Sequence, residues 1–248
     1  MHASFHSQDN PLIRKIESIF TLSDDERQAL ENLPMQVAVI KNDQDIVREG
    51  DRPSRSCLIL SGFTATYKIT IGGKRQIVAF GIPGDIPDLQ SIHLKTLDIS
   101  IGTITQCRIG FITHEDLHGL CARYPRIAVA FWRETLIEGA IFREWVTNDG
   151  CREAYNRMAH VLCELLVRLR AVGLAEAYAC ELPITQGEFA DAMGITTVHV
   201  NRVLQAMRVD GLIELNGDRL NIPDWDRLKD VGEFDPTYLH LESDRAAA

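Results

Sequence analysis

Residues 184–213 read ITQGEFADAMGITTVHVNRVLQAMRVDGLI, with the signals of two helices and a turn between them. Thr185 and Glu188 form the S/T-x-x-E pattern that satisfies free amides at a helix start. Gly194 supplies the positive φ that a sharp turn needs, and Thr196 can cap a second helix. In that second helix, apolar residues recur at the spacing of one buried face: Val200, Val203, Leu204 and Met207. The sequence therefore predicts a helix-turn-helix.

A short hairpin follows this motif. Asn216-Gly217-Asp218-Arg219 separates two short apolar runs, which is a turn signal between strands and predicts a wing. The outer face of the second helix is free of acids and carries Thr197, Val198, Asn201, Arg202, Gln205 and Arg208. Arginine can donate two hydrogen bonds to guanine in the major groove of DNA. We therefore expect this face to bind DNA.

Overall composition neither indicates nor excludes DNA as a partner. The 248 residues include 26 basic and 35 acidic ones, a net charge of −9, so a DNA-binding surface has to be local. With 45% hydrophobic and 25% charged residues, the chain has the composition of a globular protein, and its length favours two domains. Six scattered cysteines without a C-x-x-C pair indicate reduced, mostly buried thiols. No leader or bilayer-spanning run is visible, so we expect a cytoplasmic protein without a membrane partner.

In the N-terminal half, a helical segment is followed by β-prone segments. Residues 11–33 predict a helical entry, with Ser23 and Glu26 as a capping box. From 35 to 112, short β-prone runs alternate with glycine turns, which indicates an antiparallel sandwich or barrel.

Residues 115–149 return to helical character, with a long helix expected over RIAVAFWRETLIEGAIFREWV (126–146). It is apolar nearly all round: Ile127, Phe131, Ile141 and Trp145 share one side, and Val129, Trp132, Leu136, Ala140 and Val146 share another. Such a helix is buried on both sides, either against its own domain and a second copy or wholly within one chain. Asn148-Asp149-Gly150 predicts a break, and residues 158–169 then form an amphipathic helix that ends near Gly173.

With these elements, the chain resembles the Crp/Fnr family of transcription regulators over nearly its whole length. IVREGDRPSRSCLILSGF (46–63), IGGKRQIVAFGIPGD (71–85), the long helix and the winged helix-turn-helix carry the resemblance. It implies an α+β chain with an effector jelly-roll barrel of the cyclic-nucleotide-binding type (1–122), a dimerisation helix with hinge (123–149) and a DNA-binding domain with tail (150–248). It also implies a homodimer that reads palindromic double-stranded DNA and contacts RNA polymerase.

The resemblance assigns DNA contacts to individual residues. Arg202 matches the family arginine that contacts guanine, whereas Val198 stands where the family commonly has Glu, which changes the expected half-site. Thr197 and Asn201 are base or phosphate candidates, and Gln186 and Arg219 are phosphate candidates. The full set of expected contacts is Thr185, Gln186, Thr196, Thr197, Val198, Asn201, Arg202, Gln205 and Arg219.

The effector pocket departs from the family members that bind cyclic AMP. Pro87-Asp88 replaces their Gly-Glu pair, and Asp98-Ile99 replaces the Arg-Ser or Arg-Thr pair that neutralises the phosphate. An aspartate repels an anion, so we expect no productive cyclic-AMP binding. The candidate pocket residues are Gly84, Asp88, Lys95, Asp98, Ser100, Phe142 and Arg143.

Three alternatives stay open beside this interpretation. His93 could ligate a haem in a gas-sensing member, although we expect no cofactor, no metal site at His114 and His118, and no iron–sulfur cluster, since the first cysteine is Cys57. A cupin-like metal enzyme needs two or more histidines inside the barrel, but residues 35–112 hold only His93, so we expect no catalysis and no catalytic residues. The winged helix could instead bind a protein.

The C-terminal tail is expected to dock rather than to extend freely. It carries four sizeable apolar side chains, Trp225, Phe234, Tyr238 and Leu239.

Overall fold

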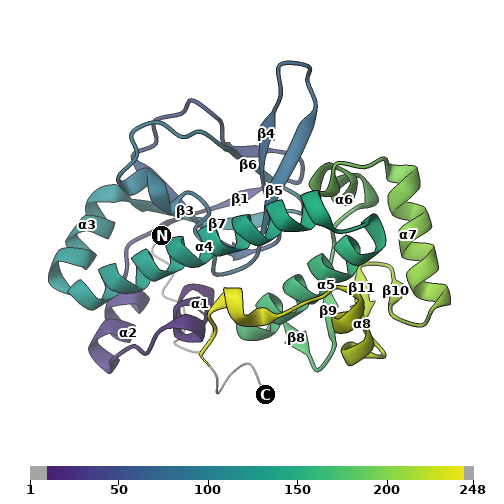
Figure 1. Ribbon diagram of the computed structural model, residues 1–248. Helices are drawn as coiled ribbons and strands as arrows, with labels where there is room; N and C mark the ends of the chain where they lie inside the picture. Colours follow the sequence, from purple (N-terminus) through teal and green to yellow (C-terminus); the bar gives the residue numbers. More distant parts are fainter. Residues whose placement is uncertain (1–9, 243–248) are drawn as a thin grey trace. The chain divides into compact units, whose positions relative to one another are not determined.

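The computed structural model describes residues 10–242, and the chain divides into two compact units. The first unit comprises the residues up to Lys68 together with Ala79–Glu138. The second comprises Ile69–Val78 and the residues from Gly139 onward. Long helix α4, Pro125–Cys151, contributes to both (Figure 1).

Two short helices open the first unit: α1, Pro11–Ile19, and α2, Asp24–Glu31. Asn10 caps α1, because its side chain accepts a hydrogen bond from the Leu12 amide at 3.0 Å. The predicted capping box of α2 is confirmed, since Ser23 and Glu26 each accept from the other's backbone amide.

Seven strands follow and form two antiparallel sheets with the orders β1-β7-β3 and β2-β6-β4-β5. The strands are β1 (Gln36–Ile40), β2 (Asp45–Val47), β3 (Arg55–Ser61), β4 (Thr64–Ile69), β5 (Arg75–Gly81), β6 (Ser100–Thr103) and β7 (Cys107–Thr113). Residues of both sheets, among them Val47, Ile59, Ile101 and Ile109, share one apolar core. The predicted antiparallel β-domain is confirmed, and β2 and β6 are strands that the sequence patterns did not indicate.

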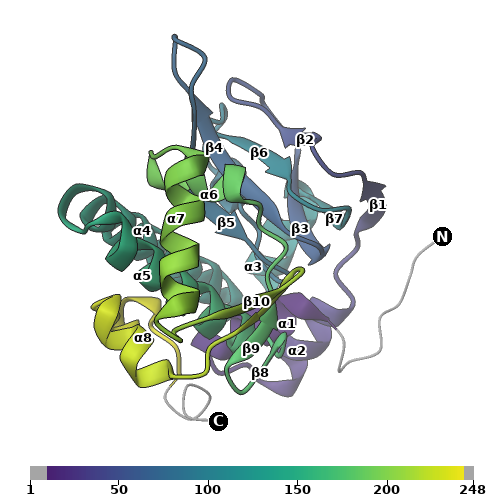
Figure 2. The same ribbon diagram turned by 90° about the vertical axis from the view of Figure 1, so that its right-hand side faces the viewer.

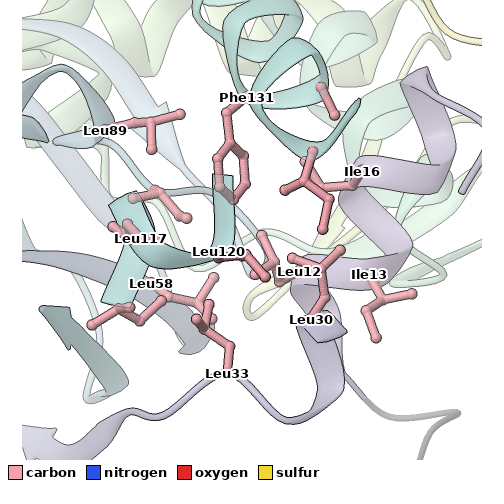
Figure 3. Packing of buried hydrophobic residues seen from close by; sticks show 14 of the residues in the cluster. Leu12, Ile13, Ile16, Leu30, Leu33, Leu58, Leu89, Leu117, Leu120 and Phe131 are labelled. Atoms are coloured by element: carbon pink, nitrogen blue, oxygen red, sulfur yellow. The ribbon is translucent and has the colours of Figure 1, made fainter. Parts of the chain in front are cut away.

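Helices pack against this domain around a second core. It joins α1 and α2 to η1 (Leu89–Ile92), α3 (His114–Arg123) and the first half of α4. Figure 3 shows Phe131 of α4 pointing toward Leu117, Leu120 and Ile16 in this cluster.

A buried lysine forms ion pairs that link α1 to the first half of α4. The Nζ of Lys15 in α1 lies 3.0 Å from a carboxylate oxygen of Asp85 and 3.0 Å from one of Glu134 in α4. Removing the Lys15 ammonium would take away the cation that lies between these two carboxylates, which is costly where water is largely excluded.

The expected break at Asn148-Asp149-Gly150 is wrong, because α4 continues through these residues to Cys151. Asn148 is buried, and its side-chain amide contacts residues of the junction and of the next helix. Its Nδ2 donates to the Arg157 carbonyl at 3.4 Å, and its Oδ1 accepts from Arg152 at 3.4 Å. A single exposed glycine costs a helix only about 1 kcal/mol, which a long packed helix tolerates. Within residues 10–242, no helix is long and apolar enough to cross a lipid bilayer.

The second unit is built around α5, Ala154–Ala171, whose predicted apolar stripe from Met158 to Leu169 is buried. A four-stranded sheet of order β10-β11-β9-β8 accompanies it. The remaining elements are β8 (Ala175–Glu176), β9 (Ala179–Glu181), α6 (Gln186–Met193), α7 (Thr197–Val209), β10 (Glu214–Asn216), β11 (Arg219–Asn221), α8 (Trp225–Val231) and η2 (Pro236–Leu239).

The C-terminal tail docks on α5 as expected, through a polar network as well as its apolar side chains. Glu164 of α5 is 0% exposed and accepts three hydrogen bonds, from Trp145 at 3.0 Å, Tyr238 at 2.8 Å and Arg168 at 3.2 Å. Burial and the Glu164 carboxylate raise the pKa of Tyr238 far above its ordinary value, so its hydroxyl stays a donor. His160 adds a bond from Nδ1 to the Gly232 carbonyl at 3.0 Å. The network thereby joins α4, α5 and the tail within the second unit.

Candidate nucleic-acid interface

The helix-turn-helix is formed by α6 and α7 as the sequence predicts. The Thr185 hydroxyl accepts from the Glu188 amide and Glu188 accepts from the Thr185 amide, which completes the capping box of α6. Gly194 ends α6 with φ +64°, a left-handed conformation that favours glycine. The Thr196 hydroxyl then accepts from the His199 amide at 3.2 Å and caps α7. Figure 2 shows α7 in front of α6, with hairpin β10–β11 starting at its lower end.

Helix α7 has one buried and one exposed face. Val200, Val203, Leu204 and Met207 are buried, as predicted from their spacing. The opposite face is exposed at Thr197, Val198, Arg202, Gln205 and Arg208. Val198 on this face is 63% exposed, so its aliphatic side chain is accessible for contact with a ligand. This face therefore fits a surface that a ligand covers.

Arg202 is ready to bind an external acceptor. In the part of the chain that the structure describes, its guanidinium forms no ion pair or hydrogen bond, and it lines a shallow hollow with Tyr155 and His199. Helix α7 contains two arginines and no acidic residue, although the whole chain has a net charge of −9. The side chain thus keeps its five donors for groups outside the chain.

Asn201 and Gln186 are brought together by the crossing of the two helices. The Asn201 Nδ2 donates to the Gln186 Oε1 at 3.2 Å. Both side chains are half-buried, so the contact lies at the edge of the exposed face.

Residues that sequence reasoning missed hold the two helices in place. The Tyr155 hydroxyl, in the first turn of α5, donates to Asp210 at the end of α7, and Arg227 of α8 donates to the Asp210 carbonyl at 2.8 Å. Burial and Asp210 raise the pKa of Tyr155 to about 12, which keeps the donor protonated. Arg157 of α5 donates to the Met193 carbonyl at the end of α6. No periodic pattern marks these residues, because their partners lie far away in the sequence.

The hairpin β10–β11 confirms the predicted wing, with Gly217 at φ +62° in its turn. Arg219 on this hairpin is half exposed and lies 3.5 Å from Glu181 of β9. An exposed ion pair of this length contributes little, about 0–1 kcal/mol, so Arg219 can exchange its partner for a phosphate.

Two of the effector-pocket candidates serve the fold of the first unit. Gly84 has φ +101°, and a Cβ there would lie 2.5 Å from the Pro11 carbonyl oxygen. Asp88 is 0% exposed, and its Oδ1 accepts from the Cys57 amide of β3 at 2.8 Å. Burial raises the pKa of Asp88 to about 6, because desolvation disfavours the charged form. One carboxylate oxygen is therefore engaged by the backbone of its own domain, whereas Oδ2 is buried without a hydrogen-bond partner among the described residues.

The other candidates do not assemble a phosphate site. Lys95 and Asp98 are exposed, whereas Ser100 is buried and accepts from the Glu49 amide at 3.0 Å. Lys68, a residue that sequence reasoning missed, donates to the main-chain carbonyl of Asp98 and pairs with the Glu49 carboxylate at 3.1 Å. Phe142 and Arg143 belong to the second unit and are half-buried and exposed, respectively.

A cavity of about 430 Å³ lies elsewhere in the first unit, between η1, α3 and α4. Its lining is mostly apolar, with Phe131 and Trp132 of α4, and it includes His93 and His118, whose ring centroids are 5.8 Å apart. Neighbouring His114 is tied to Ser91 at 2.9 Å, and burial together with His118 lowers its pKa. Within residues 10–242, no three His, Cys, Asp or Glu side chains are grouped to hold a metal ion.

Comparisons with known proteins agree with this architecture. Residues 38–124 match the cyclic nucleotide-binding domain, and residues 156–231 match the Crp-like helix-turn-helix domain. The chain is 28% identical to regulatory protein HlyX of Actinobacillus pleuropneumoniae over 84% of this chain and 87% of that protein. It is 26% identical to the fumarate and nitrate reduction regulatory protein of Salmonella typhi, over 84% and 83%. The structure of FixK2 from Bradyrhizobium japonicum superposes with a TM-score of 0.73 at 22% identity, covering 80% of this chain and 98% of that one.

Proposed function

Because the chain belongs to the Crp/Fnr family of DNA-binding transcription regulators, we propose that it reads a palindromic site as a homodimer, with α7 of each copy in the major groove. The observation that carries this proposal is the exposed, acid-free outer face of α7 with its unpaired Arg202. The Crp/Fnr family consists of transcription regulators and not of enzymes, so the alternative of a cupin-like metal enzyme is set aside.

The second copy is expected to pack along α4. Its exposed apolar residues Val129, Trp132, Leu136 and Val146 follow heptad spacing, and Gly139 and Arg143 complete the same seam. Ile127, Phe131, Ile141 and Trp145 on the other side are already buried within the chain. Two such helices side by side would cover the exposed seam.

Native mass spectrometry tests this dimer. Leu136→Glu places a charge at the centre of the seam, so the variant should shift to monomer at micromolar concentration. Val39→Glu is the control, because Val39 on β1 is 61% exposed compared with 58% for Leu136 but lies away from α4. A Leu136→Glu variant that stays dimeric would contradict the proposed seam.

Selection from randomised duplexes tests the DNA site. We expect a palindrome whose half-site centres lie about one helical turn, 34–36 Å, apart. Arg202→Ala should cost about 1–3 kcal/mol and relax the preference for one guanine, because it removes a base contact. Arg219→Ala should weaken binding to all sequences alike, because it removes a phosphate contact. No preferred sequence in the selection would point to the protein-binding adaptor instead.

Cyclic AMP is not expected to control this DNA binding. Asp88 is held by the Cys57 amide, and the side chain at the expected phosphate position is the acid Asp98. Calorimetry with cyclic AMP should therefore give no heat of binding; low-micromolar affinity would contradict this proposal.

Sensing of a small ligand is a second candidate function, and the cavity beside His93 favours it. Its volume of about 430 Å³ falls within the usual range for ligand pockets, about 300–1,000 Å³. Titration with hemin is the direct probe: a haem sensor would give the absorbance band of ligated haem, and His93→Ala would abolish it. An unchanged hemin spectrum would remove haem from this candidate.

One further partner and the compartment follow from the same proposal. A regulator that acts on promoters has to meet RNA polymerase, and both the polymerase and the DNA lie in the cytoplasm of a bacterial cell. Pull-down of RNA polymerase on a promoter fragment that carries the selected palindrome would test this step.

A further inference from the structure

The outer face of α7 has one amide whose orientation is set by another helix. Asn201 Nδ2 donates one of its two hydrogens to Gln186 Oε1 at 3.2 Å. Gln186 is the first residue of α6, next to Thr185, whose capping box fixes the start of that helix. The backbone that carries the Gln186 acceptor is therefore fixed. This hydrogen bond orients Asn201, whereas Arg202 beside it forms no hydrogen bond within the described residues.

This contact leaves a defined pattern of donor and acceptor for an external group. Asn201 keeps its Oδ1 as an acceptor and the second Nδ2 hydrogen as a donor. In the major groove, adenine presents the complementary pair, a donor at N6 and an acceptor at N7. Guanine presents two acceptors, and it would leave the Asn201 oxygen without a donor.

We propose that Asn201 reads an adenine in the half-site next to the guanine read by Arg202, and that Gln186 is the positioning residue that fixes the Asn201 amide. The inference rests on the proposed entry of α7 into the major groove. It changes the role expected for Gln186 from a phosphate contact to a residue that acts on base preference. Turning the Asn201 amide over alone would place two oxygens against each other, and only a simultaneous turn of the Gln186 amide would restore the hydrogen bond.

Substitutions at Gln186 separate the two roles. Gln186→Glu can only accept, so it keeps the Asn201 amide in place while its charge repels DNA. Gln186→Lys can only donate, so it turns the Asn201 oxygen inward and leaves both amide hydrogens facing the base. A phosphate contact would respond the other way: the lysine would bind more tightly with unchanged base preference.

The experiment uses the full-length protein and the duplex recovered from selection, with the base pair on either side of the guanine changed to each alternative. Dissociation constants are measured by fluorescence anisotropy at one salt concentration for wild type, Asn201→Ala, Gln186→Glu and Gln186→Lys. Val209→Lys is the control, because Val209 is 87% exposed at the end of α7, is not among the expected DNA contacts, and gains the same charge while the Asn201 amide stays untouched. Melting temperatures verify folding, and Gln186→Met, which can neither donate nor accept, replaces any variant that fails to fold.

We expect wild type to prefer adenine by about 5- to 150-fold, the range of one good bidentate contact, and Asn201→Ala to lose that preference. Gln186→Glu should bind every duplex more weakly yet keep the preference, Gln186→Lys should move it toward guanine, and Gln186→Met should reduce it by about 2- to 10-fold. Full adenine preference in Gln186→Lys or Gln186→Met, or an unchanged preference in Asn201→Ala, would overturn the inference. In those cases the guanine preference that depends on Arg202 would persist, whereas failure of the proposed function would remove every base preference at once.

Discussion

Replacing Asp88 with asparagine should stabilise the first unit at neutral pH and remove part of its pH dependence. Asp88 is completely buried, and burial raises its pKa from the ordinary 3.8 to about 6. The folded state therefore holds the proton more tightly than the unfolded state, and ionisation opposes folding. This cost is absent below the unfolded pKa, grows between pH 4 and 6, and is complete above the folded pKa. The difference between the two pKa values corresponds to about 3 kcal/mol at pH 7.

Urea unfolding of wild type and Asp88→Asn between pH 3 and 8 measures this cost. The amide keeps an oxygen that can accept from the Cys57 amide, and its NH2 group takes the place of Oδ2, which has no hydrogen-bond partner among the described residues. We expect the stability of the variant relative to wild type to rise by about 2 kcal/mol between pH 4 and pH 7, because the amide does not ionise. Asp98→Asn controls for the loss of one negative charge, because Asp98 is exposed. A difference between Asp88→Asn and wild type that stays constant across this range would refute the assignment of the raised pKa to Asp88.

Three other predictions concern the second unit. Val198→Glu should move base preference at its contact toward cytosine, since a carboxylate accepts from cytosine N4; an unchanged site in duplex selection would show that Val198 faces no base. Tyr238→Phe should lower the free energy of unfolding by about 1.5–3 kcal/mol, because it removes a hydrogen bond to the buried Glu164 carboxylate, and urea unfolding that shows less than about 0.5 kcal/mol would contradict this. Gly194→Ala should cost about 1–2 kcal/mol in thermal unfolding because φ is +64°, whereas Gly187→Ala, with its new Cβ in ordinary contact, should not destabilise; equal effects would disprove the strain at Gly194.

Features encoded by a few neighbouring residues could be predicted from sequence. The capping boxes at Ser23 and Thr185, the turn at Gly194 and the buried stripe of α7 all depend on chemistry within one or two helical turns. The resemblance to a family then supplied the order of the elements, which no local pattern contains.

Features whose partners lie far apart in sequence could not be predicted in this way. Strands β2 and β6 are short and partly polar, and they form because Asp45 pairs with Gly102 across the sheet. The break expected at Asn148 is absent because Arg157, in the next helix, supplies the carbonyl that this amide needs. Asp88 likewise supports the fold, because its carboxylate accepts a hydrogen bond from the Cys57 amide. The resemblance to effector-binding family members does not reveal this contact.

The network around Glu164 determines which fragment of this protein can fold when expressed alone. The family match for the helix-turn-helix covers residues 156–231, but Trp145 and Tyr238 lie outside it and donate two of the three hydrogen bonds to the Glu164 carboxylate. A fragment cut to the family limits would leave Arg168 as the one remaining donor of these three to the Glu164 carboxylate, and each lost hydrogen bond to a charged group costs about 1.5–3 kcal/mol. Isolation of the DNA-binding half by recombinant expression or limited proteolysis should therefore yield a stable product only when it includes both flanks, from about residue 139 to about residue 242.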